Sequence, residues 1–234
     1  HQRAYCASNL NIVVVGDLSL AQAQAVSQQI SQALPQGWSA IELGAAAPAT
    51  GTTLSVEQPG ASSVVLIALP VSVPANHPQY PALVLASEVL GSGIASRLMN
   101  ELRLRRGLTY GIYTRVNAWS AGGLFSAEWD IAPEYVEGSQ VLVETLLREF
   151  IEQGPTQAEL QVARKQLAGQ LLRDVAQNKL LAALLTQITQ QRQPADFLGS
   201  CIERLASLTP ADVRAVMQRQ LDLSQAVRVS VGPP

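Results

Sequence analysis

The chain has 234 residues, of which 47% are hydrophobic and 15% charged, a composition that predicts a substantial buried core and no disordered region. Its 16 basic and 18 acidic residues give a net charge of −2, which, with only 5% aromatic residues, argues against a nucleic-acid-binding surface. The longest apolar run, residues 64–71, contains a proline and is too short to span a bilayer, so we expect no membrane span.

The two ends and the cysteines say little about the compartment. The chain starts at His1 without a basic-then-apolar secretion pattern, which favours a fragment or a processed product. We leave the compartment unknown and expect a soluble protein, periplasmic or cytoplasmic if it is bacterial. Cys6 and Cys201 form either a disulfide or two buried free thiols, and the sequence does not decide between them.

The first predicted elements are a strand and a helix. Residues 11–16 form a β-branched run that ends in Gly-Asp, which predicts a buried strand. Ser19 suits a helix N-cap, and the predicted helix runs to about Leu34, where Pro35 stops it. A flexible loop and two strands follow, at residues 44–51, 52–58 and 63–72.

The middle of the chain predicts two helices and a hairpin. The helices, at residues 80–91 and 95–106, are separated by Gly91-Ser-Gly93, and Gly107 suits the position just past a helix end. The alternating segments 108–119 and 124–131 predict two strands, joined by a turn that contains residues 121–123. Further helices at about 134–153, 156–190, 194–206 and 210–220, and a last strand at 226–231, complete the prediction.

This order of elements predicts an α+β fold with a mixed, mainly antiparallel sheet covered by helices on one side. The strands are spread over the whole chain, so a cut would leave orphaned sheet edges. We therefore predict a single domain over residues 9–232, preceded by an N-terminal tail or linker remnant at residues 1–8.

A zinc site is the first functional candidate to test. A zinc peptidase helix needs two histidines one turn apart, with a glutamate between them as base. The histidines here are His1 and His77, and neither has a glutamate or cysteine at ligand spacing. His77 lies in a polar loop, where we expect a solvated surface imidazole. The sequence predicts no zinc site within this chain.

Nucleotide binding and acid–base catalysis are also poorly supported. Gly91-Ser-Gly93 follows a helix rather than a strand, and Ser96 takes the place of a third glycine, so an inter-helix turn is the better interpretation. No Ser–His pair is favoured by the sequence. Glu128 and Asp130 share one strand face, where solvated residues are a simpler explanation than paired catalytic carboxylates.

Arg103 and Tyr110 are the remaining candidates. Arg103, Arg105 and Arg106 lie in the last turn of the predicted helix, where cations complement the helix dipole by roughly 0.3–1 kcal/mol each, and the Tyr110 ring has a place in the core. In the functional alternative, helix–Gly–strand geometry brings a guanidinium and a hydroxyl to one end of the sheet. There they would bind a peptide carbonyl and stabilise its developing oxyanion.

The spacing Gly93-x-x-Ser-Arg-Leu98, Leu102-Arg103 and Gly107-Leu-x-Tyr110 resembles the signature of the non-catalytic domain in pitrilysin/insulinase-type zinc peptidases, which include mitochondrial processing peptidase. The segments at 9–17 and 154–160 agree with it, so the resemblance covers essentially the whole chain. It implies two related α+β halves, on one chain or two, that close around an unfolded peptide. One half carries a His-x-x-Glu-His zinc motif, and the other supplies an arginine and a tyrosine seven residues apart.

The resemblance therefore implies that Arg103 and Tyr110 bind and polarise the substrate. Because the zinc motif is missing from this sequence, it implies a non-catalytic half without a cofactor of its own, inactive alone, with zinc in a partner half in cis or in trans. Zinc-bound water on that half would attack the scissile carbonyl of a peptide bound as an added strand.

Three alternatives stay open at this point. The chain is either such a substrate-binding half or a purely structural assembly module derived from the same family, like the peptidase-derived core subunits of respiratory complexes. An independent metal-free hydrolase has no residue constellation behind it. A domain cut from a clamshell also exposes the surface meant for its partner half, so the sequence does not decide whether the chain forms a homodimer.

Overall fold

The computed structural model describes residues 4–41, 44, 47–119, 122–194 and 196–233. The chain divides into two compact units, His1–Ala45 with Gly169–Phe197 and Ala46–Ala168 with Leu198–Pro234, and each is described by itself. The single domain over residues 9–232 and the tail at residues 1–8 stay predictions.

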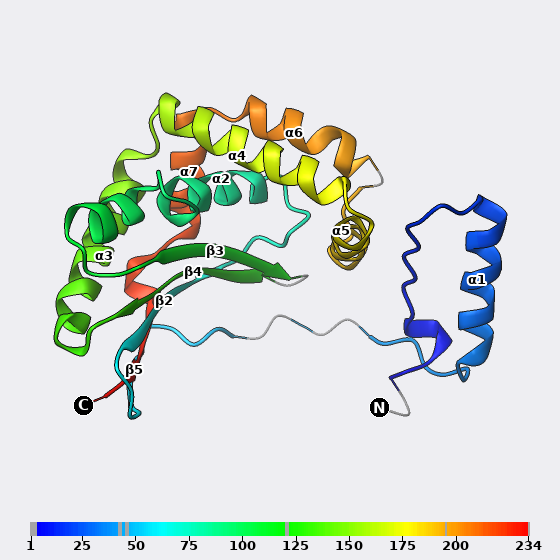
Figure 1. Cartoon of the computed structure of the whole chain (residues 1–234), viewed down its shortest axis with the longest axis horizontal. Helices are drawn as coiled ribbons and strands as arrows, with labels where there is room; N and C mark the ends of the chain where they lie inside the picture. The colour runs from blue at the N-terminus through cyan, green and yellow to red at the C-terminus, as the bar shows by residue number, and fades with distance from the viewer. Residues whose placement is uncertain (1–3, 42–43, 45–46, 120–121, 195, 234) are drawn as a thin grey trace. The chain divides into compact units, whose positions relative to one another are not determined.

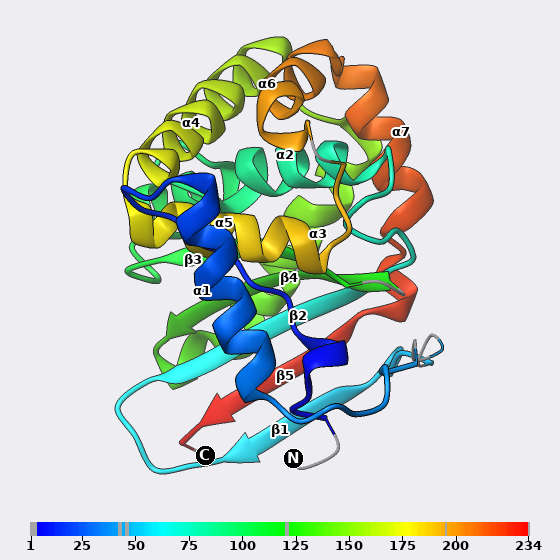
Figure 2. The ribbon, with the colours of Figure 1, turned by 90° about the vertical axis from the view of Figure 1, so that its right-hand side faces the viewer.

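The larger unit is built on a five-stranded sheet with the strand order β1-β5-β2-β4-β3. Its strands are β1 (Thr53–Glu57), β2 (Ser63–Val71), β3 (Ile112–Trp119), β4 (Gly122–Ile131) and β5 (Val227–Gly232). Only β1 and β5 run parallel, and the other neighbours are antiparallel. Figure 2 shows β5 between β1 and β2. The predicted mixed, mainly antiparallel sheet of an α+β fold is confirmed.

Helices cover one face of this sheet, as predicted (Figure 1). The covering helices are α2 (Tyr80–Gly91), α3 (Val136–Gln153) and α7 (Pro210–Gln220). Helix α6 (Phe197–Ser207) and the first part of α4 (Gln157–Val175) form a further layer beyond α2 and α7. Short helical turns at Pro133–Tyr135 and Leu223–Gln225 precede α3 and β5. Within the described residues, no helix is long and apolar enough to cross a membrane.

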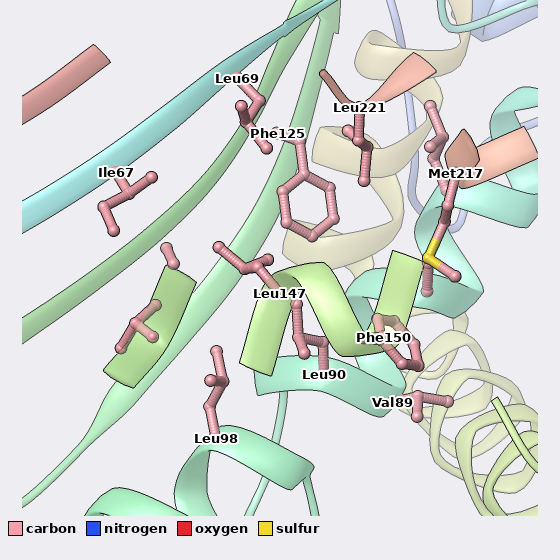
Figure 3. Close-up of a cluster of buried hydrophobic side chains, with 14 of the residues drawn as sticks. Ile67, Leu69, Val89, Leu90, Leu98, Phe125, Leu147, Phe150, Met217 and Leu221 are labelled. Atoms are coloured by element: carbon pink, nitrogen blue, oxygen red, sulfur yellow. The ribbon is translucent and has the colours of Figure 1, made fainter. Parts of the chain in front are cut away.

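The core of the larger unit lies between the sheet and its helices. Strand alternation sends every second residue of β2 and β4 toward the helices, so Leu69 and Phe125 are fully buried there. Figure 3 shows them close to Leu147 of α3 and Met217 of α7. Each large apolar side chain buried in this way contributes about 1.5–3 kcal/mol relative to exposure. The indole N–H of buried Trp129 donates to Ser139 Oγ at 3.0 Å, so its one polar group is also satisfied.

The smaller unit contains a short helical turn, Ala7–Asn9, the helices α1 (Leu20–Ala33) and α5 (Asn178–Gln190), and the end of α4. The predicted N-cap of α1 is confirmed. Ser19 Oγ accepts the N–H of Gln22, while the Gln22 side chain accepts the N–H of Ser19, which satisfies two free donors at the helix start.

Two predictions in this unit were wrong. Residues 11–15 are extended but form no strand, because no segment among the described residues pairs with them as a neighbouring strand. The predicted helix at 156–190 is divided into α4 and α5 at Ala176 and Gln177. Within the predicted loop at 44–51, Gly44 and residues 47–51 have no regular secondary structure, and residues 45 and 46 lie outside the described residues.

A close approach between α2 and β3 explains Gly91, the last residue of α2. A Cβ at this position would lie 2.6 Å from Thr114 Cγ2 and 2.9 Å from the Thr114 main-chain nitrogen. Thr114 itself is held, because its hydroxyl donates to the Ser87 carbonyl oxygen at 2.7 Å. Gly91 therefore packs a helix against a strand, and no phosphate-binding role is needed to explain it.

Replacement of Gly91 by alanine should therefore destabilise the larger unit. We expect Gly91→Ala to lower the free energy of unfolding by about 1–3 kcal/mol, because the added methyl overpacks the contact with Thr114. Thermal unfolding followed by circular dichroism measures this as a fall in Tm of several degrees. Gly138→Ala in α3 is the control, since nothing lies within 4 Å of its added Cβ, and its Tm should stay or rise. Equal Tm values for the two variants would contradict the packing argument.

Candidate functional site

The segment between α2 and β3 carries both predicted site residues. It begins with the turn after Gly91, where Gly93 has a φ of +145° and the Ser96 hydroxyl donates to the Gly93 carbonyl oxygen at 2.6 Å. The chain then enters a helix at Arg97. The Ser96 carbonyl oxygen accepts both the main-chain N–H of Asn100 at 3.0 Å and its side-chain amide at 3.1 Å.

This helix is a π-helix from Met99 to Arg105, labelled η2. The helix predicted at 95–106 is therefore present, but it begins later and is wider than an α-helix. Met99 and Leu102 anchor it in the core, while Arg103 lies on its exposed side. Single π-turns are rare in proteins overall, and those that do occur are often found at functional sites.

Gly107 ends η2 as predicted. Its φ of +62° is the left-handed conformation that glycine adopts without strain. The Gly107 N–H donates to the Arg103 carbonyl oxygen at 3.0 Å, and the Leu108 N–H donates to the Leu102 carbonyl oxygen at 2.8 Å. These bonds satisfy the last carbonyls of the helix and turn the chain sharply toward β3.

One acidic residue forms ion pairs with two of the three arginines at the end of this helix. Glu101 accepts hydrogen bonds from Arg105 at 3.1 Å and from Arg106 at 2.8 Å. The hydrogen bond from Arg106 is the main cause of the lowered pKa of Glu101. Arg103 is exposed, and the described residues offer its side chain no hydrogen bond or ion pair. Of the three arginines, Glu101 thus pairs with Arg105 and Arg106 and not with Arg103.

Tyr110 lies in a bend before β3. Its side chain is 93% exposed, so the alternative in which the ring packs in the core is wrong. The strand predicted from residue 108 begins only at Ile112, because buried Thr109 shapes the bend. The Thr109 hydroxyl accepts the Gly111 N–H at 3.1 Å and donates to the Gly111 carbonyl oxygen at 2.9 Å. Arg103 and Tyr110 therefore stand exposed on either side of one glycine turn.

Arg97 fixes the start of the helix that carries Arg103. Its guanidinium forms a bidentate pair with Glu159 at 2.7 and 2.8 Å and donates to the Gly154 carbonyl oxygen at 3.1 Å. It also lies 4.7 Å from the centre of the Phe150 ring. Planar, two-point pairing of this kind sets orientation as well as distance. The junction between α3 and α4 thereby positions the site.

Glu159 completes this network from the other side. It accepts the Thr156 N–H at 2.7 Å and the Thr156 hydroxyl at 2.9 Å, as in a capping box at the start of α4. Burial opposes ionisation of Glu159, but hydrogen bonds from Arg97 and Thr156 outweigh it and lower its pKa to about 2. Sequence reasoning missed the pairing of Arg97 with Glu159, although Thr156-x-x-Glu159 is a readable capping signal.

The other residues that the sequence singled out lie apart from this segment. Glu128 and Asp130 are exposed on β4, on the sheet face opposite the helices. His77 is half-buried in its loop, where Nδ1 accepts the Gln79 N–H at 3.1 Å, so it is less solvated than predicted. Cys6 and Cys201 are free thiols. Among the described residues, no group of three or more His, Cys, Asp and Glu side chains is placed to hold a metal ion.

The fold is that of an α+β domain, and the exposed arginine–tyrosine turn is its candidate site. The chain belongs to the family described as "Peptidase M16 inactive domain", whose model matches residues 1–167. The resemblance inferred from the sequence is thus confirmed, and the chain is an inactive domain of this peptidase family.

Individual relatives agree with this assignment. A crystal structure titled as the peptidase M16 inactive domain from Pseudomonas fluorescens is 32% identical, with a TM-score of 0.90 over 98% of this chain and 55% of that chain. An "uncharacterized zinc protease" of Streptomyces coelicolor is 30% identical over 159 residues, which are 65% of this chain and 33% of that protein. A Helicobacter pylori protein named "Non-peptidase homolog" is 40% identical over 81 residues, 35% of this chain and 19% of that protein. The chain thus spans a third or less of these curated relatives.

The network around Glu159 predicts a pH-dependent stability. A carboxyl whose pKa falls from 4.5 to about 2 on folding stabilises the fold above pH 4.5, and this contribution is lost as the pH falls toward 2. The side chain is 29% exposed, so we expect Glu159→Gln to cost about 1–2 kcal/mol at pH 7 and much less near pH 3. Urea unfolding at pH 7, 5, 4 and 3 measures the difference from the unchanged protein.

Glu128→Gln is the matched control for this experiment, since it removes the same charge from an exposed strand position. It should leave the free energy of unfolding within about 0.5 kcal/mol at each pH. A cost for Glu159→Gln that stays constant down to pH 3 would show that the carboxylate is not the group that Arg97 stabilises.

Proposed function

We propose that this domain binds an extended peptide for a zinc-bearing homologous half and assists hydrolysis of that peptide. The observation that carries the proposal is that Arg103, without a hydrogen bond or ion pair among the described residues, and Tyr110 are both exposed on either side of the turn at Gly107. A side chain without an internal partner gains most from a ligand, because no existing hydrogen bond has to be broken.

The chemistry of the two side chains suits a main-chain carbonyl. A guanidinium offers parallel N–H donors in a fixed plane, and a phenol offers one O–H donor. Both donors bind a carbonyl oxygen more strongly as negative charge develops on it. Every peptide bond carries such an oxygen, so the substrate class we propose is an unfolded or extended polypeptide rather than one sequence.

Closure of a second half over this turn would exclude water from it. In solvent, the exposed Arg103 and Tyr110 interact weakly with any dipole, since water screens them. Between two halves, the same donors act in a lower dielectric and also fix the orientation of the peptide. The proposed role of the chain is therefore to bind and orient, and to stabilise charge on the carbonyl oxygen.

The metal belongs to the other half in this proposal. The described residues do not fit a zinc site, because no cluster of three suitable ligands forms among them. The chain spans 33% of the S. coelicolor relative that is named a zinc protease, which leaves room in that protein for a second half.

A second candidate function is a purely structural assembly module. The name of the H. pylori relative, a non-peptidase homolog, favours it. In that case the turn at Gly107 would make no contribution to turnover, and the same variants separate the two candidates.

The experiment uses this chain with the His-x-x-Glu-His-bearing half encoded in the same genome, assayed on an unfolded protein substrate. We expect Arg103→Ala to lower kcat/KM on the order of 10²-fold, and Tyr110→Phe about 10-fold, because each removes a donor to the carbonyl oxygen. Zinc content, measured by atomic absorption, should not change in either variant.

Arg105→Ala is the matched control, since it removes the same charge two residues from Arg103 but from a side chain already paired with Glu101. It should keep kcat/KM within about twofold. Full activity of both Arg103→Ala and Tyr110→Phe would rule out the assigned roles and favour the assembly module.

A further inference from the structure

Residues 4–41 form a small closed element. Asn9 joins its two ends, because its side-chain amide donates to the Trp38 carbonyl oxygen at 3.0 Å and its Oδ1 accepts the Ala40 N–H at 2.6 Å. The Ala7 N–H donates to the Pro35 carbonyl oxygen at 3.1 Å. An extended run and helix α1 lie side by side between these ends (Figure 1).

This element has no core of its own. All of residues 4–41 are described, and Cys6 is the only buried one among them. Helix α1 has no buried residue, and its Leu20 side chain is 75% exposed. A helix of 14 residues is marginal in water without tertiary packing. Packing against a further apolar surface would therefore stabilise this element.

The extended run has the properties of a strand that lacks a ladder. Residues 12–15 are Ile-Val-Val-Val, the β-branched composition that favours pleated surfaces. Their side chains are half-buried, and no hydrogen bond of their main-chain N–H groups is made within the described residues. Partly buried N–H groups without partners are costly, so a ladder on this run would stabilise it. An apolar groove lined by Ile12, Val14 and Leu20 runs between the run and α1.

The charge pattern marks this element as an interface. Asp17 is the single charged residue between residues 4 and 41, whereas 15% of the whole chain is charged. The polar positions of α1 are glutamine and serine throughout. Depletion of charge is the compositional mark of interface cores, while solvent-facing helices are rich in lysine and glutamate.

We propose that residues 10–33 are an interface element for the homologous zinc-bearing half, in which residues 11–16 add a strand to an edge of that half's sheet and α1 packs on the sheet face. The inference rests on the two-half arrangement of the proposed function. A half homologous to this one offers suitable edges, since the sheet here ends in β1 and β3. The match with the P. fluorescens structure covers 98% of this chain but only 55% of that chain. The remainder of the P. fluorescens chain leaves room for such a second half.

The test measures binding rather than turnover, so it is independent of Arg103 and Tyr110. The probe is the His-x-x-Glu-His-bearing half from the same genome, titrated calorimetrically with the full chain. We expect Val14→Asp to raise Kd by on the order of 100-fold, because it places a carboxylate in the apolar groove. Gln29→Asp adds the same charge on the exposed side of α1, outside the groove, and should change Kd less than threefold.

Hydrogen exchange followed by mass spectrometry separates strand addition from simple side-chain contact. On formation of the complex, the amides of residues 12–15 should become at least 10-fold slower in exchange, while unchanged protection of β2 and β4 reports that each variant is folded. Unprotected amides in a formed complex, or equal Kd values for Val14→Asp and Gln29→Asp, would overturn the proposal. Protection of the same amides in a homodimer of this chain alone would assign the surface to a second copy instead.

These outcomes are distinct from failure of the proposed function. Should Arg103→Ala leave turnover intact while Val14→Asp abolishes binding, the element is an interface and the arginine has no catalytic role. Should Val14→Asp bind normally while Arg103→Ala loses turnover, the site holds and this interface does not.

Discussion

The bidentate pair between Arg97 and Glu159 is the interaction on which the geometry of the site depends. It joins the first residue of a helix to the first turn of α4 and, through the Phe150 ring and the Gly154 carbonyl oxygen, to the end of α3. Loss of the pair would leave η2 anchored only by its apolar side, and apolar contacts fix position less strictly than planar, two-point hydrogen bonding. The hydrogen bonds of Arg97 with Glu159 and Gly154 thus fix the start of the helix that carries Arg103.

The arginines at the end of η2 differ in their pairing, because within the part of the chain that the structure describes two of them form ion pairs and one does not. Three arginines within four positions would repel one another, and the single carboxylate of Glu101 forms ion pairs with two of them. The third arginine, Arg103, has no acidic partner among the described residues and precedes a turn held by main-chain bonds around Gly107.

The sequence predicted the fold better than the site. The strand at residues 63–72 and the helix cap at Ser19 can both be recognised from neighbouring residues alone, and both are present in the structure. The run at 11–16 failed because a strand is completed by a partner that no local pattern supplies. Whether the Tyr110 ring packed inside or lay outside depended on the bend that Thr109 makes, and the π-turn in η2 and the pairing of Arg97 with Glu159 depended on tertiary contacts.

The position of β5 has a consequence for how the protein is made. This last strand lies between β1 and β2, and β1 is bonded to no other strand among the described residues. Strand β1 can therefore join the sheet only after β5 is present, since Thr53 pairs in register with Arg228. Pairing across such a sequence separation is slow, because a long loop must close first. During synthesis on the ribosome, β1 and one edge of β2 stay unpaired until residues 227–232 have emerged, so a nascent chain that stalls before them would expose unpaired strand edges to aggregation.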